Sequence, residues 1–260
     1  MANHATITNV NLPVIKGIID RRMLVNYRVD PAILSRVLPA PFRPQVVGGF
    51  GIAGICLIRL KALHPNWLPS LPGWSSENAA HRCAVEWNQN GEVRSGVYIP
   101  RRDTNSRLTV GMGGRLFPGI HHHARFDVHE QDDRIEISVE SDDGEVQLAV
   151  AARLADDLPT GSIFASMQEA SDFFEAGSIG YSATLDQGRF DGLKLRCQRW
   201  KVEPVEVESL RSSFFDDPAR FPAGSAQLDC ALLMRDIHHE WHGEPQLCGD
   251  EIMTKSTAPG

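Results

Sequence analysis

The 260-residue chain contains little lysine, few cysteines and no long hydrophobic run. Of its 26 cationic side chains 21 are arginines, and the five lysines are Lys16, Lys61, Lys194, Lys201 and Lys255. Lysine can supply the primary amine that forms an imine with a carbonyl compound, whereas arginine makes fixed, bidentate contacts with carboxylates. Lysine chemistry therefore has few candidate residues in this chain.

The five cysteines are scattered and form no Cys-x-x-Cys pair, which is typical of reduced thiols rather than of a disulfide framework. The longest apolar stretch, residues 46–58, contains four glycines and is too short to span a bilayer. The first residues lack the basic flank and apolar segment of a signal peptide. We therefore expect a soluble, cytoplasmic protein with no membrane partner.

The charge balance argues against a nucleic-acid partner. Lys and Arg number 26 against 33 Asp and Glu, a net charge of −7, whereas binding to phosphates requires a basic face. The hydrophobic fraction of 42% is ordinary for a globular protein. The sequence shows no repeat or linker, so we expect a single domain over residues 1–260, with a core at about residues 20–245 and flexible termini. No cofactor and no metal are expected.

Alternation with a period of two dominates the sequence and predicts a mainly β fold. In residues 77–88 one face carries Glu77 and then apolar side chains, while the other face is mostly polar. Asn90 and Gly91 are a strong hairpin signal before a second strand at residues 93–99. Further strands are expected at residues 22–29, 120–128, 135–139, 146–152, 181–185, 193–202 and 227–237.

Two short helices are expected beside these strands. Asp30 and Pro31 suit the start of a helix over residues 32–38, and Ser166 with Glu169 forms a capping-box pattern for a helix near residues 166–176. The expected fold class is therefore mainly β (α+β), an antiparallel barrel, closed or nearly so, with a few short peripheral helices.

Two short motifs lie in contexts that do not suit their usual functions. Residues 49–54 match G-x-G-x-x-G, but β-type sequence follows and no acidic residue appears before Glu77, which favours a glycine-rich strand over a dinucleotide site. Residues 239–242, His-Glu-Trp-His, are one position short of the H-E-x-x-H motif of zinc hydrolases. A solvated surface cluster is favoured there, and a metal-dependent hydrolase is the weakest functional hypothesis.

Three adjacent histidines cannot all face one ion, because neighbouring strand residues point to opposite faces. Alternation places His122 with Ala124 on the apolar face, and places His121 and His123 on the polar face. His122 is therefore the interior candidate for acid–base chemistry. A hydrogen-bonded core histidine explains this position equally well.

Glu77 and His81 share the apolar face of their predicted strand. An interior carboxylate is costly unless it is paired or neutral, so Glu77 is a candidate functional residue. Alternatively, Glu77 lies in the loop before the strand. Arg101 and Arg102 follow the next strand, and a guanidinium fork suits a small carboxylate. A structural ion pair with Asp103 or Glu77 would explain either arginine as well.

Several segments resemble proteins of the acetoacetate decarboxylase-like superfamily. Residues 22–42 are similar to its N-terminal strand, D-P-x-x-L helix and L-P-x-P turn. The segments that resemble an uncharacterised bacterial branch more closely, within about residues 20–240, are residues 53–59, 75–82, 97–104, 114–122 and 231–236. The resemblance implies a cone-like β-barrel around a polar pocket. Related enzymes are oligomeric, so it also implies a homo-oligomer.

The resemblance also bears on the chemistry. In the decarboxylase, a lysine of a Lys-Lys pair forms an imine with a 3-oxo acid, and a glutamate on the preceding strand lines the pocket. By this resemblance Glu77 occupies the position of the glutamate, and His121 and His122 occupy the positions of the lysine pair. Histidine cannot supply the primary amine of an imine. The most characteristic chemistry of the superfamily is therefore not expected.

Two functional hypotheses follow. The first is a lyase-like enzyme that acts on a small oxo acid or a related carbonyl compound by acid–base chemistry. Its candidate residues are His122 or His121 with Glu77 for catalysis, and Arg101, Arg102 and His81 for substrate binding. The second is a non-catalytic barrel that binds or senses a small molecule.

Overall fold

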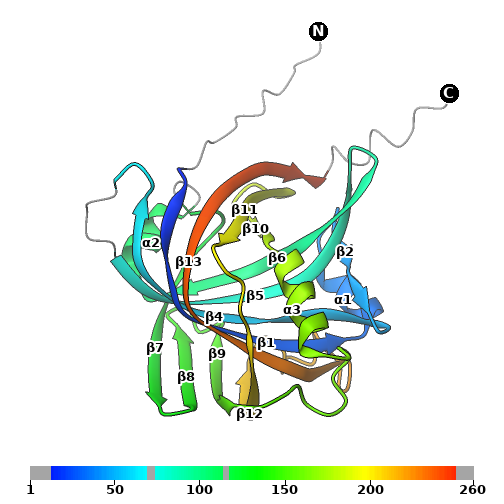
Figure 1. Cartoon of the computed structure of the whole chain (residues 1–260). Helices are drawn as coiled ribbons and strands as arrows, with labels where there is room; N and C mark the ends of the chain where they lie inside the picture. Colours follow the sequence, from blue (N-terminus) through cyan, green and yellow to red (C-terminus); the bar gives the residue numbers. More distant parts are fainter. Residues whose placement is uncertain (1–12, 69–73, 114–116, 250–260) are drawn as a thin grey trace, which may run out of the picture.

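The computed structural model describes residues 13–68, 74–113 and 117–249 (Figure 1). Residues 1–12 and 250–260, which belong to the predicted flexible termini, lie outside the described residues. The strands of the described part are β1 (Ile15–Val29), β2 (Arg43–Pro44), β3 (Val46–Val47), β4 (Phe50–Pro65), β5 (Trp74–Gln89), β6 (Glu92–Thr104), β7 (His122–Gln131), β8 (Arg134–Ser141), β9 (Gln147–Leu154), β10 (Ile179–Ala183), β11 (Arg189–Cys197), β12 (Glu203–Ser212) and β13 (Ala226–Cys248). Its helices are α1 (Pro31–Val37), α2 (Arg107–Met112) and α3 (Met167–Ala176). The predicted mainly β fold with short helices is confirmed.

Local sequence signals set the ends of several elements. Asn90 and Gly91 have positive φ angles of 53° and 83° and form the tight turn between β5 and β6. The Asp30 side chain accepts hydrogen bonds from two backbone amides at the start of α1. Ser166 accepts from the amide of Glu169, and the Glu169 carboxylate accepts from the amide of Ala165. The predicted caps of α1 and α3 are therefore present.

Strand pairing closes the sheet into two rings. The first, which we call the large ring, runs β6-β7-β8-β9-β12-β13-β1-β4-β5 and closes through the β5–β6 pair. The second, the small ring, runs β11-β10-β6-β5-β4-β1-β13 and closes through the β11–β13 pair. In Figure 1 the long strands β1, β4, β5 and β13 cross the middle of the molecule, with β7 to β9 on one side and β10 and β11 on the other. Strands β1, β4, β5, β6 and β13 thus belong to both rings.

The two faces of these shared strands border different interiors. One face carries Met23, Val25, Ile55 and Leu57, which belong to the main apolar core with residues of β8 and β9. The opposite face carries residues such as Leu24 and Cys56, which pack with α3, and Leu60 and Met234, which form a further cluster. Because both faces are covered, these strands read as nearly continuous apolar runs rather than as alternating ones.

The glycine-rich segment is part of β3, its turn and β4. Gly48 and Gly49 have φ angles of 57° and 85° in the turn before β4. A Cβ on Gly54 would lie within 2.3 Å of the backbone oxygen of Val25 on the neighbouring strand β1. Since β4 rather than a helix follows the turn, these glycines serve a turn and a close approach of two strands.

Several elements differ from the predictions. The strand predicted at residues 227–237 continues as β13 to Cys248, through the histidine cluster, and helix α2 and strand β12 were not predicted. Strand β4 was missed as one long element because seven successive residues, from 51 to 57, are buried and show no alternation. No helix in the described part is long and apolar enough to cross a membrane.

Candidate ligand-binding cavity

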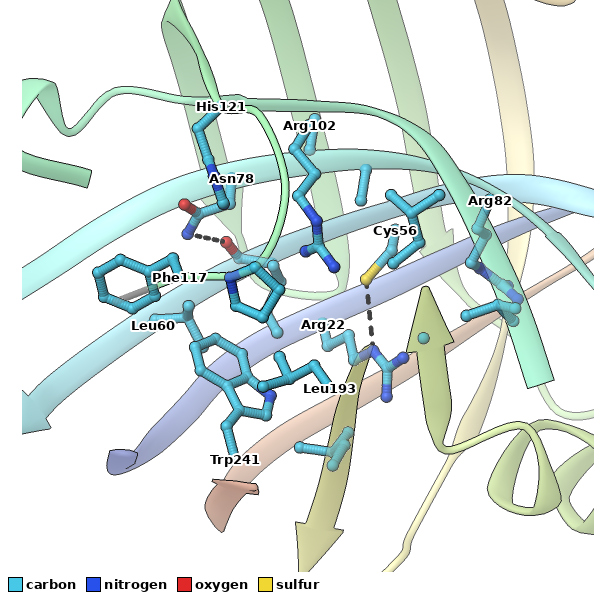
Figure 2. A pocket seen from close by; sticks show the side chains of 18 of the residues that line it. Arg22, Cys56, Leu60, Asn78, Arg82, Arg102, Phe117, His121, Leu193 and Trp241 are labelled. Carbon is cyan, nitrogen blue, oxygen red and sulfur yellow. Dashed lines mark hydrogen bonds between the residues drawn. The ribbon is translucent and has the colours of Figure 1, made fainter. Parts of the chain in front are cut away.

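A cavity of about 140 Å³ lies inside the small ring (Figure 2). Strands β1, β4, β5, β6, β11 and β13, together with α3 and the segment before β7, supply its walls. Much of the wall is apolar, and the large apolar side chains are Leu60, Phe117, Phe174, Leu193, Trp200 and Trp241. Its polar lining residues include Arg22, Cys56, Asn78, Arg82, Arg102 and His121. An apolar pocket with a few convergent polar groups is typical of a small-molecule site.

Arg22 reaches the cavity from β1. Its Nε donates to the Sγ of Cys56 at 3.3 Å, and its Nη1 lies 3.8 Å from the Sδ of Met234. The guanidinium also lies over the Trp200 ring, 5.7 Å from the centroid. Sulfur atoms and an aromatic face stabilise a cation weakly compared with a carboxylate. Most of the charge on Arg22 is therefore left uncompensated.

Arg82 lies on β5 and is only 5% exposed. It donates from Nη2 to Oδ1 of Asn26, and it lies 4.9 Å from the centroid of the Phe174 ring. Its Nε is buried without a hydrogen-bond partner in the described part of the chain. Burial lowers the pKa of Arg82 to about 10, so the side chain remains charged at neutral pH.

Arg102 enters the cavity because β6 contains a bulge. The β5–β6 register steps from His81–Arg101 to Cys83–Tyr98, which gives β6 one extra residue at this point. Val97 and Ile99 line the cavity before the bulge, and Arg102 lines it afterwards. The Arg102 Nε donates to Oγ of Ser182 at 2.9 Å, and burial lowers its pKa to about 10.

None of these three arginines forms an ion pair with a carboxylate among the described residues. Arg82 is buried, and Arg22 and Arg102 are half-buried. Arginines in such surroundings are ordinarily paired, because an uncompensated charge away from water is costly. Asp103 also lines the cavity, but its carboxylate is bonded to Arg101. The three arginines therefore leave a net positive charge at the cavity that an anion would neutralise.

His121 lines the same cavity, immediately before β7. Burial and the positive charge of Arg102 lower the pKa of His121 to about 3. The imidazole is thus neutral at pH 7, and the lowered pKa makes it a weaker base than an ordinary histidine. An anion bound at Arg102 would offset part of this charge and raise the pKa of His121 toward its ordinary value.

Glu77 does share a face with Ala79 and His81, as the alternation predicted, but this face borders the large ring. Its carboxylate bonds to Arg21 at 2.6 Å and to Arg59 at 2.5 Å. Both arginines also bond to Glu130 of β7. Glu77 is therefore part of an ion-pair network and is not among the residues lining the cavity.

The structure likewise places His122, Arg101 and His81 away from the cavity lining. His122 lies 3.1 Å from Asp143, and Arg101 bonds to both Asp103 and Asp143. His122 and Glu77 each have their own charged partners, so the structure does not bring this predicted pair together. The ion-pair interpretation holds for Arg101, whereas Arg102 faces the cavity.

His81 is fully buried in the main core. Its ring stacks on Phe214 with centroids 4.4 Å apart, and neither ring nitrogen has a hydrogen-bond partner in the described part of the chain. Burial, with smaller contributions from Arg101 and Arg220, lowers its pKa to about 3. His81 is therefore a neutral packing residue in this structure.

The lysines of the described residues lie away from the cavity. Lys194 is flanked on β11 by Leu193 and Leu195, which line the cavity, so alternation directs Lys194 to the other face. The remaining three described lysines form ion pairs, namely Lys16 with Glu240, Lys61 with Asp20 and Lys201 with Glu203. Lys255 lies outside the described residues. The geometry gives no support to imine formation in the cavity.

The histidine cluster of β13 shows no metal-binding geometry. His242 bonds to Glu240 at 2.9 Å, and His239 is buried beside Trp241. Across the three described ranges no group of three or more His, Cys, Asp or Glu side chains is arranged to hold a metal ion.

Comparison with known proteins gives the family. The sequence profile of DUF2071, described as an uncharacterised conserved protein, matches residues 19–233. The chain belongs to this family. No curated protein matches it in sequence.

Solved structures show that the fold is that of acetoacetate decarboxylase. The decarboxylase of Legionella pneumophila is 10% identical and superposes with a TM-score of 0.56 over 89% of this chain and 86% of its own. An acetoacetate decarboxylase-like enzyme of Sphingomonas wittichii RW1 is 12% identical, with a TM-score of 0.59 over 95% and 98%. The enduracididine biosynthesis enzyme MppR, complexed with pyruvate, is 9% identical, with a TM-score of 0.55 over 92% and 90%. The predicted acetoacetate decarboxylase-like fold is confirmed.

Arg22, Arg82 and Cys56 are cavity residues that sequence reasoning missed. Arg22 directly follows Arg21 on β1, and Arg82 directly follows His81 on β5, so in each pair one residue faces each interior. The scarcity of lysine beside abundant arginine was a signal for anion binding, but alternation alone does not say which face borders the cavity. Both faces of the shared strands are buried, so hydrophobicity does not separate them.

Proposed function

We propose that this protein binds a small oxo acid in the cavity of the small ring. The observation that carries the proposal is the set of three arginines, Arg22, Arg82 and Arg102, which line one apolar-walled cavity and form no ion pair with a carboxylate of the described residues. A carboxylate would accept charge-assisted hydrogen bonds from a guanidinium there. Trp200, Trp241 and Phe117 would pack against the carbon skeleton of the acid.

The carbonyl part of the proposed ligand rests on the fold. MppR, which shares this fold, is described in complex with pyruvate. In this chain His121 offers a neutral imidazole at the cavity, and the Asn78 side chain, whose nitrogen donates to Ile58 and Ser76, offers its amide oxygen. The imidazole is able to hydrogen-bond a carbonyl oxygen or a hydroxyl, and the amide oxygen is able to accept from a hydroxyl.

Binding is tested by calorimetric titration with a panel of 2-oxo and 3-oxo acids, beside the methyl ester of each acid. We expect the acids to bind and the esters to bind at least about tenfold more weakly, because a charge-assisted hydrogen bond contributes roughly 1.5–3 kcal/mol. Arg102→Gln should weaken binding to a similar extent. Arg125→Gln, which changes an exposed arginine paired with Glu140, is the matched control. Equal binding of acids and esters would contradict the proposal.

Conversion of the bound acid is a second candidate function, favoured by the position of His121 beside Arg102. A neutral imidazole can accept a proton from the carbon next to a carbonyl while the arginine stabilises the developing negative charge. Exchange of that proton with D₂O, followed by proton NMR, measures this step. His121→Gln should abolish the exchange while the acid still binds. Wild-type protein that binds the acid without exchange would leave binding or sensing as the function.

Imine chemistry is tested separately with borohydride. We expect that incubation with each oxo acid and borohydride leaves the intact mass unchanged, because the lysines described in the structure are ion-paired or face away from the cavity. Mass spectrometry of the whole chain is the measurement. A substrate-sized adduct would instead show a reactive lysine, and peptide mapping would locate it.

A further inference from the structure

We infer that the ligand is a small dianion whose two acidic groups bind two separate arginine subsites. This inference rests on the proposed function and narrows its substrate class. One subsite is formed by Arg22 and Arg82, and the other by Arg102 with His121. In Figure 2 His121 and Arg102 lie on one side of the pocket and Arg82 on the opposite side, with Cys56 between Arg102 and Arg82.

The first subsite lies where the cavity meets α3. Arg22 and Arg82 line the main cavity and also a smaller adjoining one that Phe174 and Gly177 border. The two guanidiniums repel each other, since the charge of Arg22 adds to burial in lowering the pKa of Arg82. The buried, unpartnered Nε of Arg82 adds a donor without an acceptor. One anionic group placed between these two cations would offset their repulsion and give the Arg82 Nε an acceptor.

The second subsite has its own cation. Arg102 is anchored through its Nε to Ser182, which fixes the guanidinium toward the cavity. Its positive charge contributes to the lowered pKa of His121. The nearest carboxylates are otherwise engaged, since Asp103 is bonded to Arg101 and Asp191 to the amide of Gly119 and the side chain of Gln246. The charge of Asp191 acts on Arg102 without an ion pair between them. An anionic group at Arg22 and Arg82 alone would therefore leave the charge of Arg102 only partly compensated.

Uncharged side chains separate the subsites. Cys56 lies between Arg102 and Arg82 in Figure 2, and Ile58, Ala80 and Ile99 add apolar surface to the same cavity. None of these side chains carries a formal charge in its ordinary state. A monoacid would neutralise one subsite and leave the other cationic and partly shielded from water, which is costly. A short chain with an acidic group at each end matches two cationic subsites across an apolar wall. The volume of about 140 Å³ restricts the chain to a few carbons.

The test compares 2-oxopentanedioate with 2-oxopentanoate, which have the same carbon skeleton but two carboxylates and one. Titration calorimetry on the wild-type chain should give at least about tenfold tighter binding of the dianion. Arg82→Gln and Arg102→Gln should each reduce the affinity for the dianion to about that for the monoanion. Arg125→Gln should leave the ratio unchanged. Thermal unfolding curves of the variants establish that each one is folded.

The outcomes separate the inference from the proposed function. Equal affinity of the two acids, or loss of the preference through one arginine variant but not the other, would overturn the two-subsite inference while oxo acid binding stands. If neither acid binds, and no other acid of the panel does, both fail. Because the first comparison uses the wild-type chain alone, it decides the question even if an arginine variant is unstable.

Discussion

Two neighbouring arginines on β1 have opposite surroundings. Arg21 is fully buried and bonds to Glu77 and Glu130, each at 2.6 Å, on the face of the large ring. Arg22 points into the cavity of the small ring, where sulfur atoms and the Trp200 ring are its partners. The charge of Arg21 is compensated within the chain, so it serves stability. Arg22 has no carboxylate partner among the described residues, so its charge is available for the proposed binding of an anion.

Replacing Glu77 should therefore affect stability rather than ligand binding. Glu77→Gln removes one of the two carboxylates around the fully buried Arg21, and we expect a loss of roughly 2–4 kcal/mol in the free energy of unfolding. Urea denaturation measures this loss, and calorimetry at a temperature where the variant is folded should give unchanged affinity for the oxo acid. A stable variant with impaired binding would contradict this prediction and indicate that Glu77 takes part in ligand binding.

Protonation of His81 should destabilise the protein in acid. Its pKa is about 3 in the folded chain against 6.5 in the unfolded chain, so the unfolded state binds more protons between these values. The stabilising contribution is complete above pH 6.5 and is lost as the pH falls toward 3. Between pH 7.5 and 5 this amounts to about 2 kcal/mol, at 1.36 kcal/mol per pKa unit.

The variant His81→Phe isolates this effect, because a phenyl ring retains stacking on Phe214 and does not titrate. We expect its stability to decrease about 2 kcal/mol less than that of the wild type between pH 7.5 and 5. His129→Gln, at an exposed position, should behave like the wild type. Parallel pH profiles of the wild type and the His81 variant would rule out His81 as the source.

At the scale of single elements, bulges and close backbone contacts determine which interior a side chain faces, which alternation alone does not. The extra residue in β6 directs Arg101 to the large ring and Arg102 to the cavity. In β4 the backbone of Gly54 lies so close to β1 that a Cβ would meet the oxygen of Val25 at 2.3 Å. Each of these features fixes the register between neighbouring shared strands.

Gly54→Ala should consequently destabilise the β1–β4 pair. The obstacle is a backbone atom, which cannot rotate away as a side chain can, and we expect a loss of about 2 kcal/mol or more in the free energy of unfolding. Gly111→Ala in helix α2 is the control, since a Cβ there meets nothing within 4 Å and alanine is the better helix former. Thermal or urea denaturation compares the two. Equal stability of both variants would show that β1 and β4 can separate at little cost.

The sequence predicted a large part of the fold and less of the site. Alternation correctly grouped Ala79 with His81, and the caps of α1 and α3 and the Asn90–Gly91 turn were visible in the residues. The choice between His121 and His122 depended on where β7 begins, and the choice between Arg101 and Arg102 depended on a bulge. Neither feature has a pattern in the linear sequence, because pairing with a distant strand creates it.

At the scale of the whole molecule, the two rings enclose different interiors. The large ring contains the main apolar core and the Arg21 network, and the small ring contains the cavity. The shared strands connect the two, with residues of the main core on one face and cavity-lining residues on the other. The fold of acetoacetate decarboxylase is thus retained, while arginines rather than a lysine define the cavity of this chain.

The shared strands also determine the order in which backbone amides meet solvent. In β1 and β4 each strand is hydrogen-bonded on both sides and packed on both faces. Strands β7 and β8, in contrast, expose many side chains along one face. Local opening reaches such outer strands long before it reaches doubly covered ones. Amides of β1 and β4 beside the cavity should therefore exchange their hydrogens only when the entire chain unfolds, and this wall of the cavity would be the last part of the molecule to lose its shape.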